Sequence, residues 1–107
     1  MTELLDRIQT LIASEARDLD QIERTLTDGY AEALSLEAER WRIERRMAEV
    51  AQGIQGGDTA TKARELASLS QRLDGNAGRL TRLRSVLADL RRHASGVRDR
   101  ERPTLTS

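Results

Sequence analysis

The chain has 107 residues, of which 34% are charged, with one Trp, one Tyr, no Phe and no Cys. This length and composition exclude a large globular core, and the lack of Cys excludes disulfides, thiolate metal sites and thiol nucleophiles. The net charge of zero combines 12 acidic and 7 basic residues in positions 1–57 with 6 acidic and 11 basic residues in positions 58–107. No basic segment precedes an apolar run, and no window reaches the roughly 18 apolar residues of a membrane span, so we expect a cytoplasmic protein without membrane insertion.

The first predicted helix covers residues 2–27, where apolar residues recur in alternating steps of three and four. Its seam consists of Leu5, Ile8, Ile12, Glu15, Leu19, Ile22 and Leu26. Glu15 is the one polar member of this seam. We expect Thr27-Asp28-Gly29 to form a turn after this helix, since Asp caps helices and Gly allows a sharp bend. A long helix that is only kinked there is the alternative.

The second predicted helix covers residues 30–53 and has two apolar faces when projected at about 100° per residue. One face contains Leu36, Ile43, Met47, Val50 and Ile54. The opposite face contains Tyr30, Leu34 and Trp41. The middle helix of three can use both faces, so Tyr30 and Trp41 either fill a core between helices or anchor a bound peptide.

A Gly-rich loop follows, and Asp58 or Thr59 is expected to cap a third helix over residues 59–95. The seam of this helix is the most regular in the chain: Leu66, Leu69, Leu73, Asn76, Leu80, Leu83, Leu87, Leu90, Ala94 and Val97. Residues 98–107 are polar and are expected to form a disordered tail.

We therefore predict an all-α fold, a three-helix antiparallel bundle or coiled coil with a long protruding third helix, in a single domain over residues 1–97. Short connections make the first and third helices parallel. Moving 61 positions along the chain takes Leu5 to Leu66 and Glu15 to Asn76. We expect Glu15 to accept a hydrogen bond from the Asn76 amide, as a pair that fixes the register of the two helices.

In this register the third helix is longer than the first, and its last apolar residues have no cover. Leu90, Ala94 and Val97 would form an exposed stripe, which indicates a partner. An amphipathic helix could lie along it, while Arg84, Arg91 and Arg92 attract acidic residues of that partner. We expect Leu87→Asp with Leu90→Asp to abolish partner binding and leave helicity intact.

Residues for catalysis or metal binding are scarce. His93 is the only His, carboxylates occur at salt-bridge spacing, and the glycines at 53–57 lack the Lys of a phosphate-binding loop. We expect no enzymatic activity, no catalytic residues, no metal and no cofactor. The arginines of the third helix have no interleaved aromatic residues, so nucleic-acid binding is a weaker alternative.

Two segments resemble the FlgN family of flagellar export chaperones. LTDGYAEALSLEAERWRIERRMAEV, starting at Leu26, is similar to the middle of these proteins. ELASLSQRLDGNAGRLTRLRSVLADLRR, starting at Glu65, is similar to their C-terminal helix, with Asn76 and Arg79-Leu80 at the matching positions.

The resemblance implies a cytoplasmic chaperone for type III export, which binds the terminal segments of hook–filament junction proteins through its C-terminal helical region. In this chain that region maps onto Leu83, Leu87, Leu90, Ala94 and Val97. A structural coiled-coil module that closes its seam by forming a homodimer remains as the alternative from another class.

Overall fold

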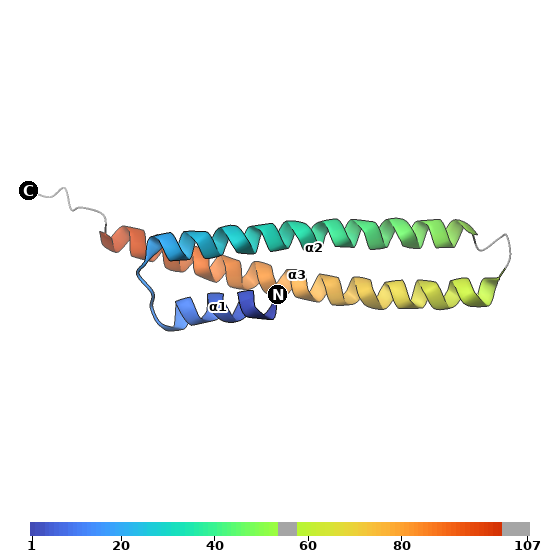
Figure 1. Cartoon of the computed structure of the whole chain (residues 1–107), viewed down its shortest axis with the longest axis horizontal. Helices are drawn as coiled ribbons and strands as arrows, with labels where there is room; N and C mark the ends of the chain where they lie inside the picture. Colours follow the sequence, from blue (N-terminus) through green and yellow to red (C-terminus); the bar gives the residue numbers. More distant parts are fainter. Residues whose placement is uncertain (54–57, 102–107) are drawn as a thin grey trace, which may run out of the picture. The chain divides into compact units, whose positions relative to one another are not determined.

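The computed structural model describes residues 1–53 and 58–101. Three α-helices contain nearly all of these residues: α1 (Thr2–Ala13), α2 (Leu19–Gly53) and α3 (Thr59–Glu101) (Figure 1). Within the described ranges there is no strand. The prediction of an all-α, three-helix chain with a long third helix is confirmed.

The first interruption of the helices lies at residues 14–18, so the predicted helix over residues 2–27 is wrong. Glu15 has a φ of 52°, in the left-handed region that ends a helix. Asp18 then starts α2, because its Oδ1 accepts a hydrogen bond from the backbone N–H of Gln21 at 3.2 Å. Asp18 followed three residues later by Gln21 is a capping pattern, which the heptad spacing of the seam concealed.

Gly29 lies inside α2 and is buried, so the predicted turn at residues 28–29 is also wrong. A Cβ atom added to Gly29 would lie 2.3 Å from Cδ2 of Leu87. The glycine therefore serves the close approach of α3 to the α2 backbone, and it does not bend the chain.

The third helix begins where the sequence indicated. Asp58 accepts hydrogen bonds from the Thr61 hydroxyl at 2.6 Å and from the Thr61 N–H at 3.1 Å. These bonds, the hydroxyl's first, lower the pKa of the Asp58 carboxyl. Asp58 is thus the N-cap of α3.

The far end of α3 differs from the prediction. The helix continues to Glu101 instead of ending near Ser95, so residues 98–101 do not belong to a disordered tail. Val97 is buried and Arg98 pairs with Glu23 of α2, which stabilises the additional turn. The remainder of the predicted tail, residues 102–107, and the loop residues 54–57, including Ile54, lie outside the described residues.

The chain divides into two compact units. The three-helix unit comprises residues 1–33 together with the chain from residue 82 onward, and the two-helix unit comprises residues 34–81. Both α2 and α3 contribute to each unit.

In the three-helix unit, α1 lies alongside the C-terminal part of α3 (Figure 1). Glu23 pairs with Arg98 and Gly29 lies against Leu87, so α2 is antiparallel to α3. Arg7 of α1 pairs with Asp28 of α2, and α1 also runs opposite to α2 (Figure 1). The fully buried side chains include Ile8 from α1. Among the described residues, the apolar core of this unit consists of Leu5, Ile8, Leu11, Ile22, Leu26, Leu83, Leu87, Leu90, Ala94 and Val97.

The two-helix unit pairs the remainder of α2 with the first half of α3. A central cluster contains Ile43, Val50 and Leu69, with Met47, Leu66 and Leu73 partly buried against it. At the end of α2, Lys62 donates a hydrogen bond to the carbonyl oxygen of Gly53. This bond satisfies one of the carbonyl groups that every helix end leaves without an intrahelical partner.

Candidate partner-binding surfaces

The stripe that the sequence predicted to be uncovered is buried in the three-helix unit. Leu83, Leu90 and Ala94 have no exposed surface. Leu87 and Val97 are buried with them. The prediction that this stripe is open for a partner is therefore wrong, because α1 and the first turns of α2 cover it within the same chain.

The cause is the register of α1 against α3. Nε2 of His93 lies 2.7 Å from the carbonyl oxygen of Ala16, a residue 77 positions earlier, where a separation of 61 was predicted. Since a carbonyl oxygen only accepts, Nε2 carries the proton and donates. His93 thus holds the end of the α1 segment beside the last turns of α3.

The basic residues named with that stripe remain at the surface. Arg84 and Arg91 are exposed, and Arg92 pairs with Asp89 on the same helix. They surround a stripe that is now inside the protein. We predicted that these arginines attract an acidic partner to the apolar stripe. Because the stripe is buried, it offers that partner no apolar surface to bind.

The predicted register pair of Glu15 and Asn76 does not form. Glu15 is an exposed residue of the connection between α1 and α2. Asn76 is fully buried in the two-helix unit, and its Nδ2 donates to the carbonyl oxygen of Leu36 at 2.9 Å. Its Oδ1 has no hydrogen-bond partner among the described residues. Asn76 therefore contacts the backbone of α2, in place of the first helix.

An apolar surface does exist on α2 of the two-helix unit. Leu34 is 67% exposed and Trp41 is 60% exposed, although both are large apolar side chains. Arg45 lies over the Trp41 ring, with its guanidinium carbon 5.4 Å from the ring centroid, in a cation–π contact. We call Leu34, Ala38, Trp41 and Arg45 the α2 face; all four are exposed and share one side of the helix by the 100° projection.

The sequence projection identified this side of α2 correctly, but not its environment. The opposite side carries Leu36, Ile43 and Val50, which are buried. Among the described residues of the two-helix unit, no third helix covers Leu34 and Trp41. Tyr30, the other aromatic residue of the predicted pair, lies in the three-helix unit and is 41% exposed. Tyr30 and Trp41 are therefore surface residues, and the core-filling interpretation is wrong for both.

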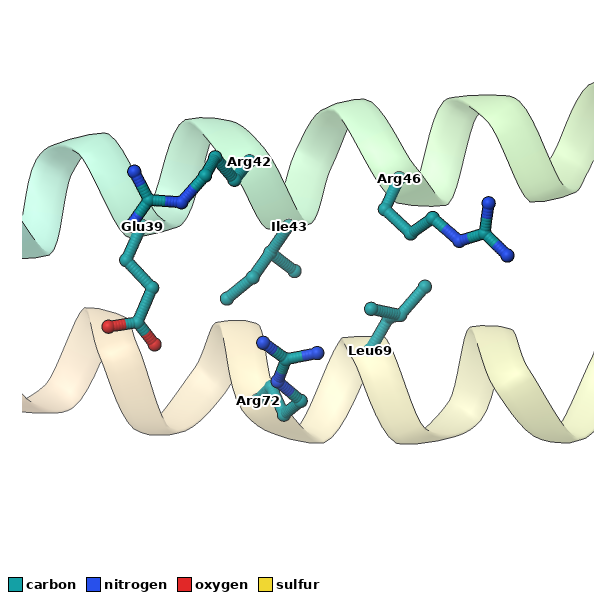
Figure 2. A pocket seen from close by; sticks show the side chains of 6 residues that line it. All are labelled: Glu39, Arg42, Ile43, Arg46, Leu69 and Arg72. Carbon is teal, nitrogen blue, oxygen red and sulfur yellow. The ribbon is translucent and has the colours of Figure 1, made fainter.

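A second surface feature lies between α2 and α3 of the same unit. Figure 2 shows Ile43 of α2 and Leu69 of α3 pointing toward one another, with charged side chains around them. They line an open hollow of about 410 Å³, which we call the arginine groove. Its lining residues are Glu39, Arg42, Ile43, Arg46, Leu69 and Arg72.

The charges around the arginine groove are only partly paired. Arg46 makes a hydrogen-bonded ion pair with Glu65 and a longer one with Glu49. The hydrogen bond with Glu65 is the main reason why the pKa of Arg46 is raised. Glu39 lies 3.7 Å from Arg79. Exposed ion pairs contribute little to stability. Their main consequence here is that they decide which charged side chains of the groove are free to contact a ligand.

No group suited to metal binding is found in the part of the chain that the structure describes. None of the described helices is long and apolar enough to cross a membrane. No protein-family model, curated protein or solved structure matches this chain.

Proposed function

We propose that this chain is a non-catalytic binding protein that holds an amphipathic segment of another protein on the α2 face. The exposure of Leu34 and Trp41 is the observation that carries the proposal. Scattered single apolar residues are normal on protein surfaces, but these two lie on the same side of one helix with Ala38 between them.

The chemistry of the α2 face suits the apolar side of a second amphipathic helix. An incoming helix would present apolar residues at spacings of three and four to Leu34 and Trp41. A tryptophan buries a large area on binding at little cost in side-chain entropy, which is why such residues dominate interface energetics. Arg45 would remain at the rim, where it contributes to orientation.

The FlgN resemblance supplies the proposed biology. In this proposal the chain is a cytoplasmic export chaperone, and its clients are the terminal segments of flagellar hook–filament junction proteins. Holding such a segment would keep it from self-associating without nucleotide or catalysis. The binding surface differs from the one that the resemblance implied, since the C-terminal stripe is packed inside the three-helix unit.

The decisive experiment compares a double variant of the α2 face with a control variant at a neighbouring exposed residue. Leu34→Asp with Trp41→Asp should weaken binding of a hook–filament junction segment by at least about tenfold in calorimetry, because both apolar anchors are lost. Ser35→Asp adds a charge at an exposed position beside the α2 face and should leave affinity unchanged. Equal affinity for the two variants would refute the α2 face as the binding site.

The same exposed surface also favours a structural homo-oligomer as the second candidate. Two copies could cover Leu34 and Trp41 by packing their α2 faces together. In that case sedimentation would show a dimer for the native chain, a monomer for the Leu34→Asp, Trp41→Asp variant and no binding of junction segments.

A further inference from the structure

The arginine groove combines an apolar floor with more positive than negative charge at its walls. Ile43 and Leu69 are both buried core residues, and their outer edges form the floor of the groove. Arg42 and Arg46 come from α2 and Arg72 comes from α3 (Figure 2). The groove is therefore built by both helices of the two-helix unit, from residues of α2 that alternate along the helix with those of the α2 face but project to another side.

Two of these arginines are unpaired among the described residues. Arg46 is paired with Glu65, and Glu39 lies near Arg79. Arg42 and Arg72 make no ion pair or hydrogen bond with any described residue, and both are exposed. An arginine remains protonated at all physiological pH values, so two permanent charges remain at the groove.

We propose that the arginine groove binds an acidic peptide segment in which carboxylates flank a branched apolar side chain. Arg42 and Arg72 each present a planar fork of N–H donors that matches a carboxylate. The apolar side chain would rest on Ile43 and Leu69, where its surface is removed from water. A simple anion has no apolar surface to bury and would lack this contribution to affinity. The proposal does not depend on the α2 face, and it assigns a second site with a different ligand chemistry.

The lining of the groove favours a peptide over a nucleic acid. A single strand would need aromatic side chains on which its bases stack, and none lines the groove. Glu39 also lies in the lining, and its charge would repel a continuous run of phosphates. A peptide with spaced carboxylates can place its charges on the arginines and avoid Glu39.

The test uses a fluorescently labelled synthetic helix in which glutamates flank leucines, titrated with the full chain and followed by anisotropy. We expect Arg42→Glu with Arg72→Glu to weaken binding about tenfold or more, since both attractive contacts become repulsive. A peptide with Gln in place of every Glu should lose a similar factor. Added salt should weaken binding of the acidic peptide much more than binding of the Gln peptide.

The matched control is Arg64→Glu, at an exposed arginine of α3 that does not line the groove. It should leave the affinity within about twofold, because Arg64 lies about 12 Å along α3 from Arg72, where screening by salt limits its effect. Circular dichroism should show unchanged helicity for all variants, as the substituted residues are exposed.

Three outcomes would overturn the proposal: an Arg42→Glu, Arg72→Glu variant that binds like the native chain, a Gln peptide that binds as well as the Glu peptide, or a control variant that loses as much affinity. Tighter binding of a single-stranded oligonucleotide than of the acidic peptide would also overturn it, in favour of phosphate recognition. A Leu34→Ala, Trp41→Ala variant, which removes the apolar anchors without adding charge beside Arg42, should bind this peptide normally, which separates failure of this site from failure of the α2 face.

Discussion

The two compact units use the same two long helices and differ in whether a third helix is present. In the three-helix unit, Leu83, Leu90 and Ala94 are completely buried. In the two-helix unit, Leu69 and Leu80 of the same seam are also buried, but Leu66 and Leu73 stay only half-buried. A heptad seam therefore does not by itself set the depth of burial, because two helices cover one side of each other and a third must close the remaining sides.

The same difference decides where partners can bind. α1 takes up the apolar surface of the three-helix unit, so nothing comparable to the α2 face remains on its seam. In the two-helix unit the outer side of α2 retains Leu34 and Trp41, and the space between α2 and α3 retains unpaired arginines. Both proposed sites lie in the unit with fewer helices for this reason.

The largest expected effect compares a fully buried leucine of the three-helix unit with a half-buried leucine of the two-helix unit. Leu90→Ala should lower the free energy of unfolding by about 2–5 kcal/mol, because it leaves a cavity in a fully enclosed core. Leu73→Ala should cost clearly less, since Leu73 is half-buried in the two-helix unit. Urea unfolding followed by circular dichroism measures both losses.

Equal losses of free energy for the two leucines would contradict the difference in their burial.

The burial of the stripe also changes the expected result of Leu87→Asp with Leu90→Asp. These substitutions would place two carboxylates in an apolar core, so we now expect them to unfold the three-helix unit and not to leave helicity intact.

The second prediction concerns the polar residue in the core of the two-helix unit. Asn76→Leu should raise the free energy of unfolding by about 1 kcal/mol, because it removes a buried Oδ1 that has no partner among the described residues. The Leu36 carbonyl would lose only the Asn76 amide. Asn76→Asp, which buries a charged side chain of similar size, should lower the free energy of unfolding in the same urea assay. If Asn76→Leu lowered it as well, the Asn76 amide would be needed for stability.

The third prediction compares two glycines inside helices. Gly29→Ala should be destabilising by about 1 kcal/mol, since overpacking against Leu87 outweighs the helix propensity of Ala. Gly78→Ala meets no atom within 4 Å and should stabilise the chain by up to about 1 kcal/mol. Thermal unfolding measures both, and Leu87→Ala should relieve the strain of Gly29→Ala. Similar gains at both glycines would rule out the close contact.

The smallest effect is expected at the start of α3. The pKa of Asp58 is lowered by its bonds to Thr61, so the folded chain favours the charged carboxylate. The stabilisation is therefore present above the ordinary pKa of about 4 and is lost as the pH falls through the lowered value. Asp58→Ala should lower the melting temperature slightly at pH 7 and make no difference at strongly acidic pH. If the difference in melting temperature between the native chain and Asp58→Ala grew as the pH fell, the result would contradict a cap that depends on a charged Asp58.

Local sequence patterns predicted much of the fold. The Asp58 cap is where its sequence context places it, and α2 ends at Gly53 as predicted. The projection of α2 separated Leu36, Ile43 and Val50 from Leu34 and Trp41 correctly, since helical geometry fixes the direction of each side chain. Of the arginine groove, the sequence showed only charged residues at helical spacing, because the groove requires Arg42 and Arg72 to approach from different helices.

The errors share one origin in long-range packing. Glu15 looked like a polar residue within a seam and is instead a residue of left-handed backbone conformation just after α1, which ends at Ala13. Asp28-Gly29 looked like a turn and is instead a point of close contact with Leu87. In each case the local pattern had two meanings, and the neighbouring helix decided between them.

The sequence by itself determined that the chain is helical, which sides of the helices are apolar and where α3 starts, because these features depend on residues a few positions apart. Only the tertiary structure decided where α1 lies along α3. A repeating seam offers several apolar registers of similar energy, and the choice depends on contacts between distant residues such as Ala16 with His93. That choice buried the stripe at Leu83–Val97 and left the surfaces of the two-helix unit open.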